Sequence, residues 1–261
     1  VPHLFHAAAN AGFRCLAAEY PRTTFRHLDL PAAGTPSASA VIGALHIATE
    51  PELALRGAKV YAKRLAYVDA VDGRPAPVLG DAAPLGFDDP AIGSGPDDHV
   101  VIIGGTGKLG LEFCEYFATR GANRITLLSR SGETASIAGR LRHIRSLGGA
   151  RVDVVACDVG DEASVLQFVY DHVTDPVDVV VHAAVNYVDA ESGDITPDLV
   201  AAATRSKVVG LMHVLAATPL APRCRVVLCS SIAATLGGRG QILYAAGNRM
   251  LDVLARTLRE Q

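Results

Sequence analysis

From about residue 98 onward, short apolar runs alternate with longer amphipathic stretches. The run at 100–103 is continuous, which is typical of a strand covered on both faces. Strands that alternate with helices predict an α/β fold with a parallel, doubly wound sheet. We expect further strands at 124–129, 152–157, 178–182 and 225–230, and helices near 108–120, 133–147, 162–173, 196–217 and 244–258.

The first part of the chain is shorter and less regular. Its pattern predicts a helix at 13–19, a strand at 26–30, a helix at 40–49 and a hairpin across Gly57, formed by 50–56 and 59–68. The stretch 81–98 is rich in Pro, Gly and Asp, which is typical of a linker. We therefore expect two parts: a structural subdomain at 1–97, with its linker from about 81, and a catalytic subdomain at 98–261.

A glycine-rich loop follows the strand at 100–103 and opens the next predicted helix. Gly105, Gly107 and Gly110 fit the pattern G-x-G-x-x-G. Such glycines allow a tight turn, and the helix N-terminus then meets the pyrophosphate of a dinucleotide. The expected cofactor contacts of the loop are Gly104, Gly105, Thr106, Gly107, Lys108, Leu109 and Gly110.

The end of the next strand indicates which dinucleotide binds. An NAD site would carry an acidic residue there, whereas this chain has Ser129, Arg130 and Ser131. A guanidinium and two hydroxyls suit a 2′-phosphate, so the sequence predicts NADPH. The alternative is that Arg130 is only a solvated loop cation.

Two hydroxyls are predicted to meet farther along the chain. Ser231 follows the apolar run at 226–228, which we expect to be a buried strand, and Tyr244 opens the last helix. Tyr244 and Asn248 are four residues apart and share one helix face. Two hydroxyls on one carbonyl oxygen suit ketone reduction, since one donates a proton and the other holds the oxygen. Each residue alone also has a structural explanation, such as packing or helix capping.

With Lys207 upstream, this arrangement resembles the ketoreductase domains of modular polyketide synthases, a branch of the short-chain dehydrogenase/reductase family. The usual family motif is Tyr-x-x-x-Lys, but here Asn248 holds the fourth position and the lysine precedes Tyr244. The resemblance implies that Tyr244 donates the proton, Ser231 binds the carbonyl oxygen and Lys207 lowers the pKa of the tyrosine. Asn248 would position Lys207 or a bridging water.

The resemblance extends to most of the chain. The segment Ala18-Glu19-Tyr20-Pro21 is similar to a recurrent part of a truncated Rossmann-like structural subdomain. In the Rossmann catalytic part, Asp158 would contact the adenine, with Val159 beside it; otherwise Asp158 or Asp161 only caps a helix. Ala183 and Ala184 would admit the nicotinamide ribose, and we expect His182 to be a packed histidine. Val185 and Asn186 depart from the family pattern, which has glycine after the two alanines.

The implied substrate is a β-ketoacyl thioester on an acyl carrier protein, with neighbouring synthase domains as further partners. Leu236 stands where one stereochemical subgroup has Trp, and only Asp189 matches the Leu-Asp-Asp motif of the other subgroup. This favours the D-hydroxy (B-type) product, unless Asp189 is an ordinary loop acid. The family continues past Gln261 with a strand and lid helices. The alternatives are a redox-silent scaffold or epimerase domain, and a free-standing dehydrogenase of small alcohols.

Composition adds little to this interpretation. A hydrophobic fraction of 49% supports a sizeable core, and a net charge of −3 argues against a general nucleic-acid or anionic-membrane binder. No run approaches the length of a membrane span and the start lacks a signal-peptide pattern. The five cysteines form no C-x-x-C pair, so we expect reduced thiols, no metal site and a cytoplasmic location.

Overall fold

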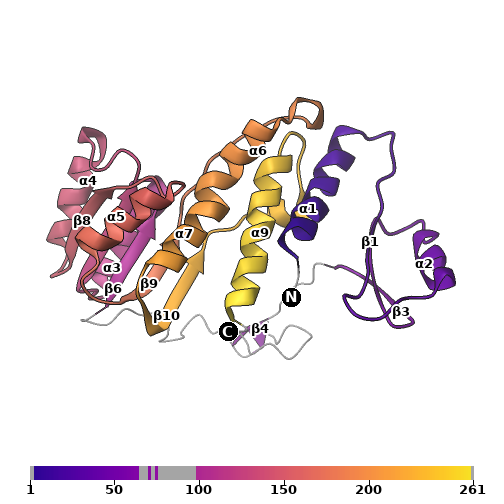
Figure 1. Cartoon of the computed structure of the whole chain (residues 1–261), viewed down its shortest axis with the longest axis horizontal. Helices are drawn as coiled ribbons and strands as arrows, with labels where there is room; N and C mark the ends of the chain where they lie inside the picture. The colour runs from indigo at the N-terminus through magenta and orange to yellow at the C-terminus, as the bar shows by residue number, and fades with distance from the viewer. Residues whose placement is uncertain (1–2, 65–69, 72–73, 76–97, 260–261) are drawn as a thin grey trace. The chain divides into compact units, whose positions relative to one another are not determined.

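The chain forms two compact units in a computed structural model that describes residues 3–64, 70–71, 74–75 and 98–259 (Figure 1). The larger unit contains described residues 3–19 and 98–259, and the smaller unit contains those between 20 and 75. Residues 81–97 of the expected linker lie outside the described residues.

The larger unit is built on the predicted parallel sheet. Its strand order is β10-β9-β6-β7-β8, and every neighbouring pair is parallel. The order changes direction between β6 and β9, and sheets of this kind bind ligands at the carboxyl ends of the strands at such a point. The strands are β6 (His99–Ile103), β7 (Arg124–Ser129), β8 (Arg151–Ala156), β9 (Val177–His182) and β10 (Leu220–Leu228).

Helices cover both faces of this sheet (Figure 1). Side chains of β6 alternate between the two faces: Val100 and Ile102 join one hydrophobic core, and Val101 and Ile103 join the other. One core includes α3 (Lys108–Thr119) and α4 (Ala135–Ser146); the other includes α5 (Glu162–His172), α7 (Gly210–Ala217) and α9 (Ile242–Arg259). The remaining helices are α6 (Pro197–Thr204), α8 (Ala233–Leu236), the 3-10 turn η2 (Ser192–Asp194) and the π-helix η3 (Arg205–Val209).

Strand β10 differs from expectation in its burial. Val226, Val227 and Leu228 are half-buried, whereas the sequence predicted a buried strand. The physical reason is position: among the described strands, β10 pairs only with β9 and forms an edge of the sheet.

The stretch Pro197–Ala217 is long and apolar enough to cross a membrane, judged by length and composition alone. In the structure it forms α6, η3 and α7, and Leu211 and Val214 are fully buried in the core of the larger unit. Packing within this fold therefore explains part of its apolar character.

Helix α1 (Leu4–Glu19) belongs to the larger unit, whereas the sequence-based boundary at residue 98 places it with the structural subdomain. Its small buried residues Ala11 and Cys15 pack against Ala233 of α8 and Ala245 of α9. Small side chains on both sides let the helices approach closely, so an N-terminal segment becomes part of the unit that carries Tyr244.

The smaller unit contains a short sheet of order β1-β2-β3. Strands β1 (His27–Asp29) and β2 (Glu52–Arg56) are parallel and joined through α2 (Ala38–Leu45), as in a βαβ unit. The expected hairpin is confirmed, since β2 pairs antiparallel with β3 (Lys59–Ala62) across Gly57, whose φ is +58°. A two-stranded sheet of β4 (Ala70–Val71) and β5 (Arg74–Pro75) follows.

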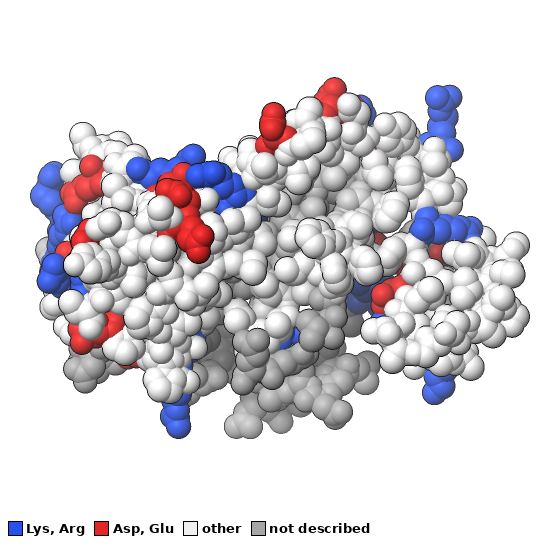
Figure 2. Space-filling view, in the orientation of Figure 1, with Lys and Arg blue, Asp and Glu red and all other residues white. Residues whose placement is uncertain are grey.

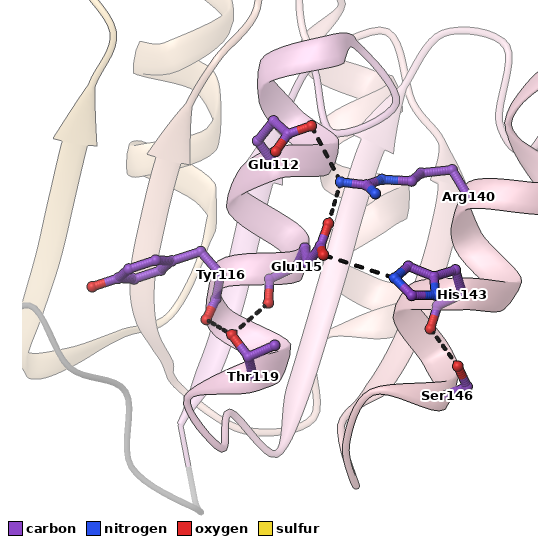
Figure 3. A network of polar contacts seen from close by, with 7 residues as sticks. All are labelled: Glu112, Glu115, Tyr116, Thr119, Arg140, His143 and Ser146. Atoms are coloured by element: carbon purple, nitrogen blue, oxygen red, sulfur yellow. Dashed lines mark hydrogen bonds and ion pairs between the residues drawn. The ribbon is translucent and has the colours of Figure 1, made fainter.

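Polar side chains tie α3 to α4 on the surface of the larger unit (Figure 3). Arg140 reaches Glu112 at 3.2 Å and also pairs with Glu115, which lies 3.8 Å from His143. In Figure 2, acidic and basic side chains lie intermixed around α4 and α5, while the visible face over α7 and α9 is mostly uncharged. Mixed charges of this kind give no single-sign patch on that face.

Candidate active site

The glycine loop is packed backbone against backbone. Gly104 has a φ of +74°, and the N–H groups of Gly104 and Gly105 donate to the carbonyl of Leu128 at 2.9 and 3.1 Å. A Cβ on Gly104 would lie 2.6 Å from Cα of Ala184, and one on Gly110 would lie 2.4 Å from the oxygen of Gly104. These glycines are required because no larger residue fits without moving backbone.

The N-terminus of α3 opens from this loop. Gly107 is its N-cap residue, and within the described part of the chain no side chain caps the helix. Gly107, Lys108 and Leu109 are exposed and Thr106 is half-buried. An uncapped helix start beside a tight glycine turn fits the pyrophosphate of a dinucleotide, since backbone N–H groups and the helix dipole attract anions.

The three residues at the end of β7 are placed differently from one another. Ser129 is half-buried and its hydroxyl donates to the carbonyl of Gly132 at 3.3 Å, which closes the turn. Arg130 and Ser131 are exposed. A guanidinium and a hydroxyl at this turn fit a 2′-phosphate.

Asp158 lies after β8, close enough to Arg130 for the positive charge to affect its pKa. Its carboxylate accepts from the N–H of Gly160 at 3.0 Å and pairs with Arg205 at 3.0 Å. Burial raises the pKa of Asp158, but the Arg205 pair, the Gly160 N–H and the charge of Arg130 outweigh it and lower the pKa. Asp161 occupies the N-cap position of α5, but its side chain makes no capping hydrogen bond.

The backbone after β9 closes the other side of the loop. The N–H of Ala183 donates to the carbonyl of Ile103 at 2.9 Å, and both Ala183 and Ala184 are half-buried. Val185 is 51% exposed, and the amide of Asn186 donates to the carbonyl of Ala202 at 3.0 Å. Val185 is therefore exposed, and it follows Ala184, whose backbone packs against Gly104. Val159, the remaining predicted contact, is buried against Gly210.

A buried lysine–asparagine pair forms the centre of the candidate catalytic cluster, which consists of Lys207, Ser231, Tyr244 and Asn248. Lys207 is 3% exposed, and its Nζ donates to Oδ1 of Asn248 at 3.0 Å. The orientation of the amide is fixed, because Nδ2 of Asn248 donates to the backbone carbonyl of Tyr244 at 2.8 Å. Nζ of Lys207 lies 5.7 Å from the centre of the Tyr244 ring. The pKa of Lys207 is lowered overall, because the effect of burial outweighs the nearby Tyr244 and Cys229, which raise it.

The half-buried phenol of Tyr244 is surrounded by groups that favour its ionised form. Burial alone would raise the pKa of Tyr244, but hydrogen bonds with Ser231 and Tyr187 and the charge of Lys207 lower it. Ser231 also accepts from the backbone N–H of Ala233 at 3.2 Å, which holds it at the start of α8. The structure thus brings together all four residues that the sequence predicted.

The position of Lys207 depends on the π-helix η3 and on His182. His182 is fully buried, and its Nε2 lies 3.1 Å from the carbonyl of Ser206, the residue before Lys207. Burial, with the charge of Lys207, lowers the pKa of His182 to about 4. A neutral imidazole that donates from Nε2 therefore anchors the wide turn that carries the lysine.

The profile of the family described as KR domain matches residues 99–261. This chain belongs to the ketoreductase domains of modular polyketide synthases. It is 36% identical to polyketide synthase GfsA of Streptomyces halstedii, over 93% of this chain and 3% of that protein. It is 35% identical to the pikromycin synthase component PikAIII of Streptomyces venezuelae, over 93% of this chain and 15% of the relative.

Solved ketoreductases have the same fold. The ketoreductase from the first module of phoslactomycin biosynthesis in Streptomyces sp. HK803 has a TM-score of 0.81 at 30% identity, over 100% of this chain and 57% of its own. An A-type ketoreductase of a modular polyketide synthase has a TM-score of 0.80 at 31% identity, over 99% of this chain and 53% of the solved chain. This chain therefore spans about half of these solved chains and a small part of the curated relatives.

Sequence reasoning missed the contribution of α1 to this ketoreductase domain. Tyr244 packs against the cluster that contains Ala11 and Cys15. Glu19 accepts from the N–H of Ser192 at 2.9 Å and of Gly240 at 3.2 Å, so it joins two loops near the catalytic cluster. The available signal was the spacing of small residues four apart in α1, which is typical of close helix packing.

Proposed function

We propose that this ketoreductase domain reduces the β-keto group of an acyl thioester to the β-hydroxyacyl thioester, with NADPH as reductant. The observation that carries the proposal is the buried Lys207–Asn248 pair beside Tyr244. Burying an ammonium is costly unless it is paired or hydrogen-bonded. Lys207 has Asn248 as its partner, and its charge lies where it stabilises a tyrosine phenolate.

The side chains divide the work of ketone reduction. Ser231 donates a hydrogen bond to the substrate carbonyl oxygen and holds it beside Tyr244. The hydride for the carbonyl carbon would come from NADPH held at the glycine loop, as the resemblance implies. Tyr244 gives its phenolic proton to the oxygen, which completes the alcohol, and the charge of Lys207 stabilises the phenolate that remains. Asn248 keeps the lysine in position through its amide oxygen.

The preference for NADPH is supported by charge at the end of β7. Arg130 and Ser131 are exposed there, and no acidic residue occupies 129–131. The glycine loop and the start of α3 would hold the pyrophosphate, and Asp158 would accept from the adenine amine. The carboxylate can accept this further hydrogen bond in addition to those from Gly160 and Arg205, because an ionised aspartate accepts several hydrogen bonds.

The proposed product is the D-hydroxy (B-type) thioester. Two positions support it: Leu236 replaces the Trp of one subgroup, and Asp189 matches the last residue of the motif of the other. Asp189 is exposed on the loop that carries Tyr187, where an incoming substrate can meet it.

The proposed partners follow from the relatives. GfsA and PikAIII are named as polyketide synthase proteins, of which this chain matches only a part. We propose that an acyl carrier protein presents the thioester, that other synthase domains flank this one, and that the assembly is cytoplasmic.

A redox-silent scaffold or an epimerase domain is the second candidate. The observation that favours it is the departure at Val185 and Asn186. One relative is named a putative inactive synthase, Pks1 of Mycobacterium tuberculosis, 39% identical over 61% of this chain and 10% of the relative. Val185 points to the surface beside Ala184, where added bulk could weaken cofactor binding.

The direct test is NADPH oxidation, followed by absorbance, with a β-ketoacyl thioester on a carrier protein. NADH and a small free ketone serve as matched comparisons. Turnover with NADPH and the thioester, and a chiral analysis that gives the D-alcohol, would support the proposal. NADPH binding without turnover of either substrate would overturn it in favour of the redox-silent domain, and equal use of the free ketone would indicate a dehydrogenase of small substrates.

A further inference from the structure

The loop between β9 and η2 is held at both ends. Near its start, the amide of Asn186 donates to the carbonyl of Ala202 on α6 at 3.0 Å. Near its end, the N–H of Ala190 donates to the carbonyl of Gly240 at 3.0 Å. Glu191 adds an ion pair with Arg239 at 2.8 Å. The residues between these points therefore have a defined position relative to α9.

Tyr187 lies on this loop and covers the ring of Tyr244. The two ring centres are 4.8 Å apart and the planes are inclined by 30°. This is within the range of favourable aromatic pairs. The two hydroxyls are also close enough to shift each other's pKa, while Tyr187 remains 66% exposed. A tyrosine exposed to this extent adds little to the core, so its contact with Tyr244 is its main structural relation.

The two phenols of the pair differ in their electrostatics. The hydrogen bond with Tyr244 raises the pKa of Tyr187, and the negative charges of Tyr244 and Asp189 add to this. For Tyr244, burial raises the pKa, but the bonds with Ser231 and Tyr187 and the charge of Lys207 lower it. Tyr187 is therefore the weaker acid of the pair, which suits it to act as a donor toward the oxygen of Tyr244.

The other groups around Tyr244 do not replace this donor. Lys207 faces it from η3, Asn248 from its own helix and Ser231 from the end of β10. On the α1 side the titratable neighbour is Cys15, whose pKa is raised by burial, so that it is a neutral thiol. When Ser231 turns its hydroxyl to the substrate carbonyl, Tyr187 is the hydroxyl left to support the Tyr244 oxygen.

We propose that Tyr187 is a positioning residue for the proton donor: its ring fixes the plane of the Tyr244 phenol, and its hydroxyl donates to the Tyr244 oxygen while Ser231 binds substrate. This inference rests on the proposed reductase function. It also gives a role to a position that aligns with the leucine of the Leu-Asp-Asp motif of one stereochemical subgroup.

Removing the hydroxyl alone separates the two roles. In Tyr187→Phe the stacked ring remains but the donor is lost, so the pKa of Tyr244 should rise. Reduction requires the protonated phenol, so its rate falls as pH rises through that pKa, and the fall should move to higher pH in the variant. A lost hydrogen bond predicts about a fivefold decrease in kcat with little change in KM. Tyr187→Leu, which also removes the ring, should decrease kcat further.

The deciding experiment is a near-ultraviolet phenolate titration of the folded domain, which is simplified because the chain has no Trp. The ionisation of Tyr244 is obtained as the difference between the titration of a protein and that of its Tyr244→Phe counterpart. This difference is measured twice, once in the parent background and once in the Tyr187→Phe background. Tyr170→Phe, at an exposed position on α5, is the control for loss of a tyrosine. Thermal unfolding of each variant confirms that the fold is intact.

An upward move of the Tyr244 transition in Tyr187→Phe, absent in Tyr170→Phe, would support the inference. An unchanged or downward move would overturn it, even if the domain turns over substrate normally. Because the titration needs no cofactor, it remains decisive if the proposed reductase activity itself is not found.

Discussion

The cofactor loop and the catalytic cluster lie at the same edge of one sheet but are built in different ways. The loop is one continuous segment, 104–110, in which backbone packs on backbone. Side chains are excluded from its closest contacts, since a Cβ added at Gly110 would lie 2.4 Å from the oxygen of Gly104. The cluster is made of side chains from separate elements: Lys207 from η3, Ser231 after β10, and Tyr244 and Asn248 from α9.

This difference predicts two kinds of sensitivity. The loop should tolerate loss of any functional group but not the addition of a methyl group. The cluster should tolerate small changes of volume but not loss of a charge or a proton. Variants that affect one region and spare the other test whether the two are separable.

Lys207→Met should have a large effect. Methionine has a similar volume, but the charge that favours the Tyr244 phenolate is lost, so kcat should decrease about 100- to 1,000-fold. The affinity for NADPH should change little, because the glycine loop is untouched. Steady-state kinetics and NADPH binding by fluorescence check both, with the exposed Lys59→Met of β3 as control. A loss of NADPH affinity as large as the loss of kcat would show that the two regions are not separable.

Gly110→Ala should have the next largest effect and the opposite pattern. The new Cβ would lie 2.4 Å from the oxygen of Gly104 and 2.7 Å from Cα of Gly105, so the backbone of the loop must move. We expect a decrease in NADPH affinity of about 100-fold, while the phenolate titration of Tyr244 stays unchanged.

The matched control is Gly139→Ala, an exposed helical glycine in α4 whose added Cβ meets only the guanidinium of Arg142, at 3.9 Å. It should raise the free energy of unfolding by about 0.5–1 kcal/mol without affecting binding. Equal NADPH affinity of the two alanine variants would contradict the packing argument for Gly110.

The contiguous loop and the cluster of separate side chains also differ in how well they could be predicted from the sequence. The sheet, its helices and the glycine loop were predicted because their signals are local: apolar runs, helical periodicity and a contiguous motif. The pairing of Lys207 with Asn248 needed the resemblance, since the residues are far apart in sequence. The half-buried state of β10 and the place of α1 depend on tertiary neighbours, and the role proposed for Tyr187 depends on a loop conformation.

His182 connects the two regions and gives the smallest of these effects. It precedes Ala183 and anchors Ser206, and burial lowers its pKa to about 4. The unfolded chain, with an ordinary histidine pKa near 6.5, binds more protons between about pH 6.5 and 4. Stability is therefore lost as pH falls through this window, by about 2 kcal/mol at pH 5.

His182→Gln should flatten that pH dependence, although packing changes lower its stability at neutral pH. Urea unfolding at several pH values measures the effect. His99 is also buried, and its pKa is lowered by burial, so it accounts for part of the slope that remains. A slope in the variant as steep as in the parent protein would rule out His182 as its source.

We propose that Tyr244 donates the proton from a site that is assembled independently of the cofactor loop. The most direct measurement compares Tyr244→Phe with the parent domain, following both NADPH affinity and single-turnover reduction of a β-ketoacyl thioester. We predict an NADPH Kd within about twofold of the parent and a reduction rate lower by about 1,000-fold or more. Reduction within about tenfold of the parent rate would contradict the assignment of Tyr244 as proton donor.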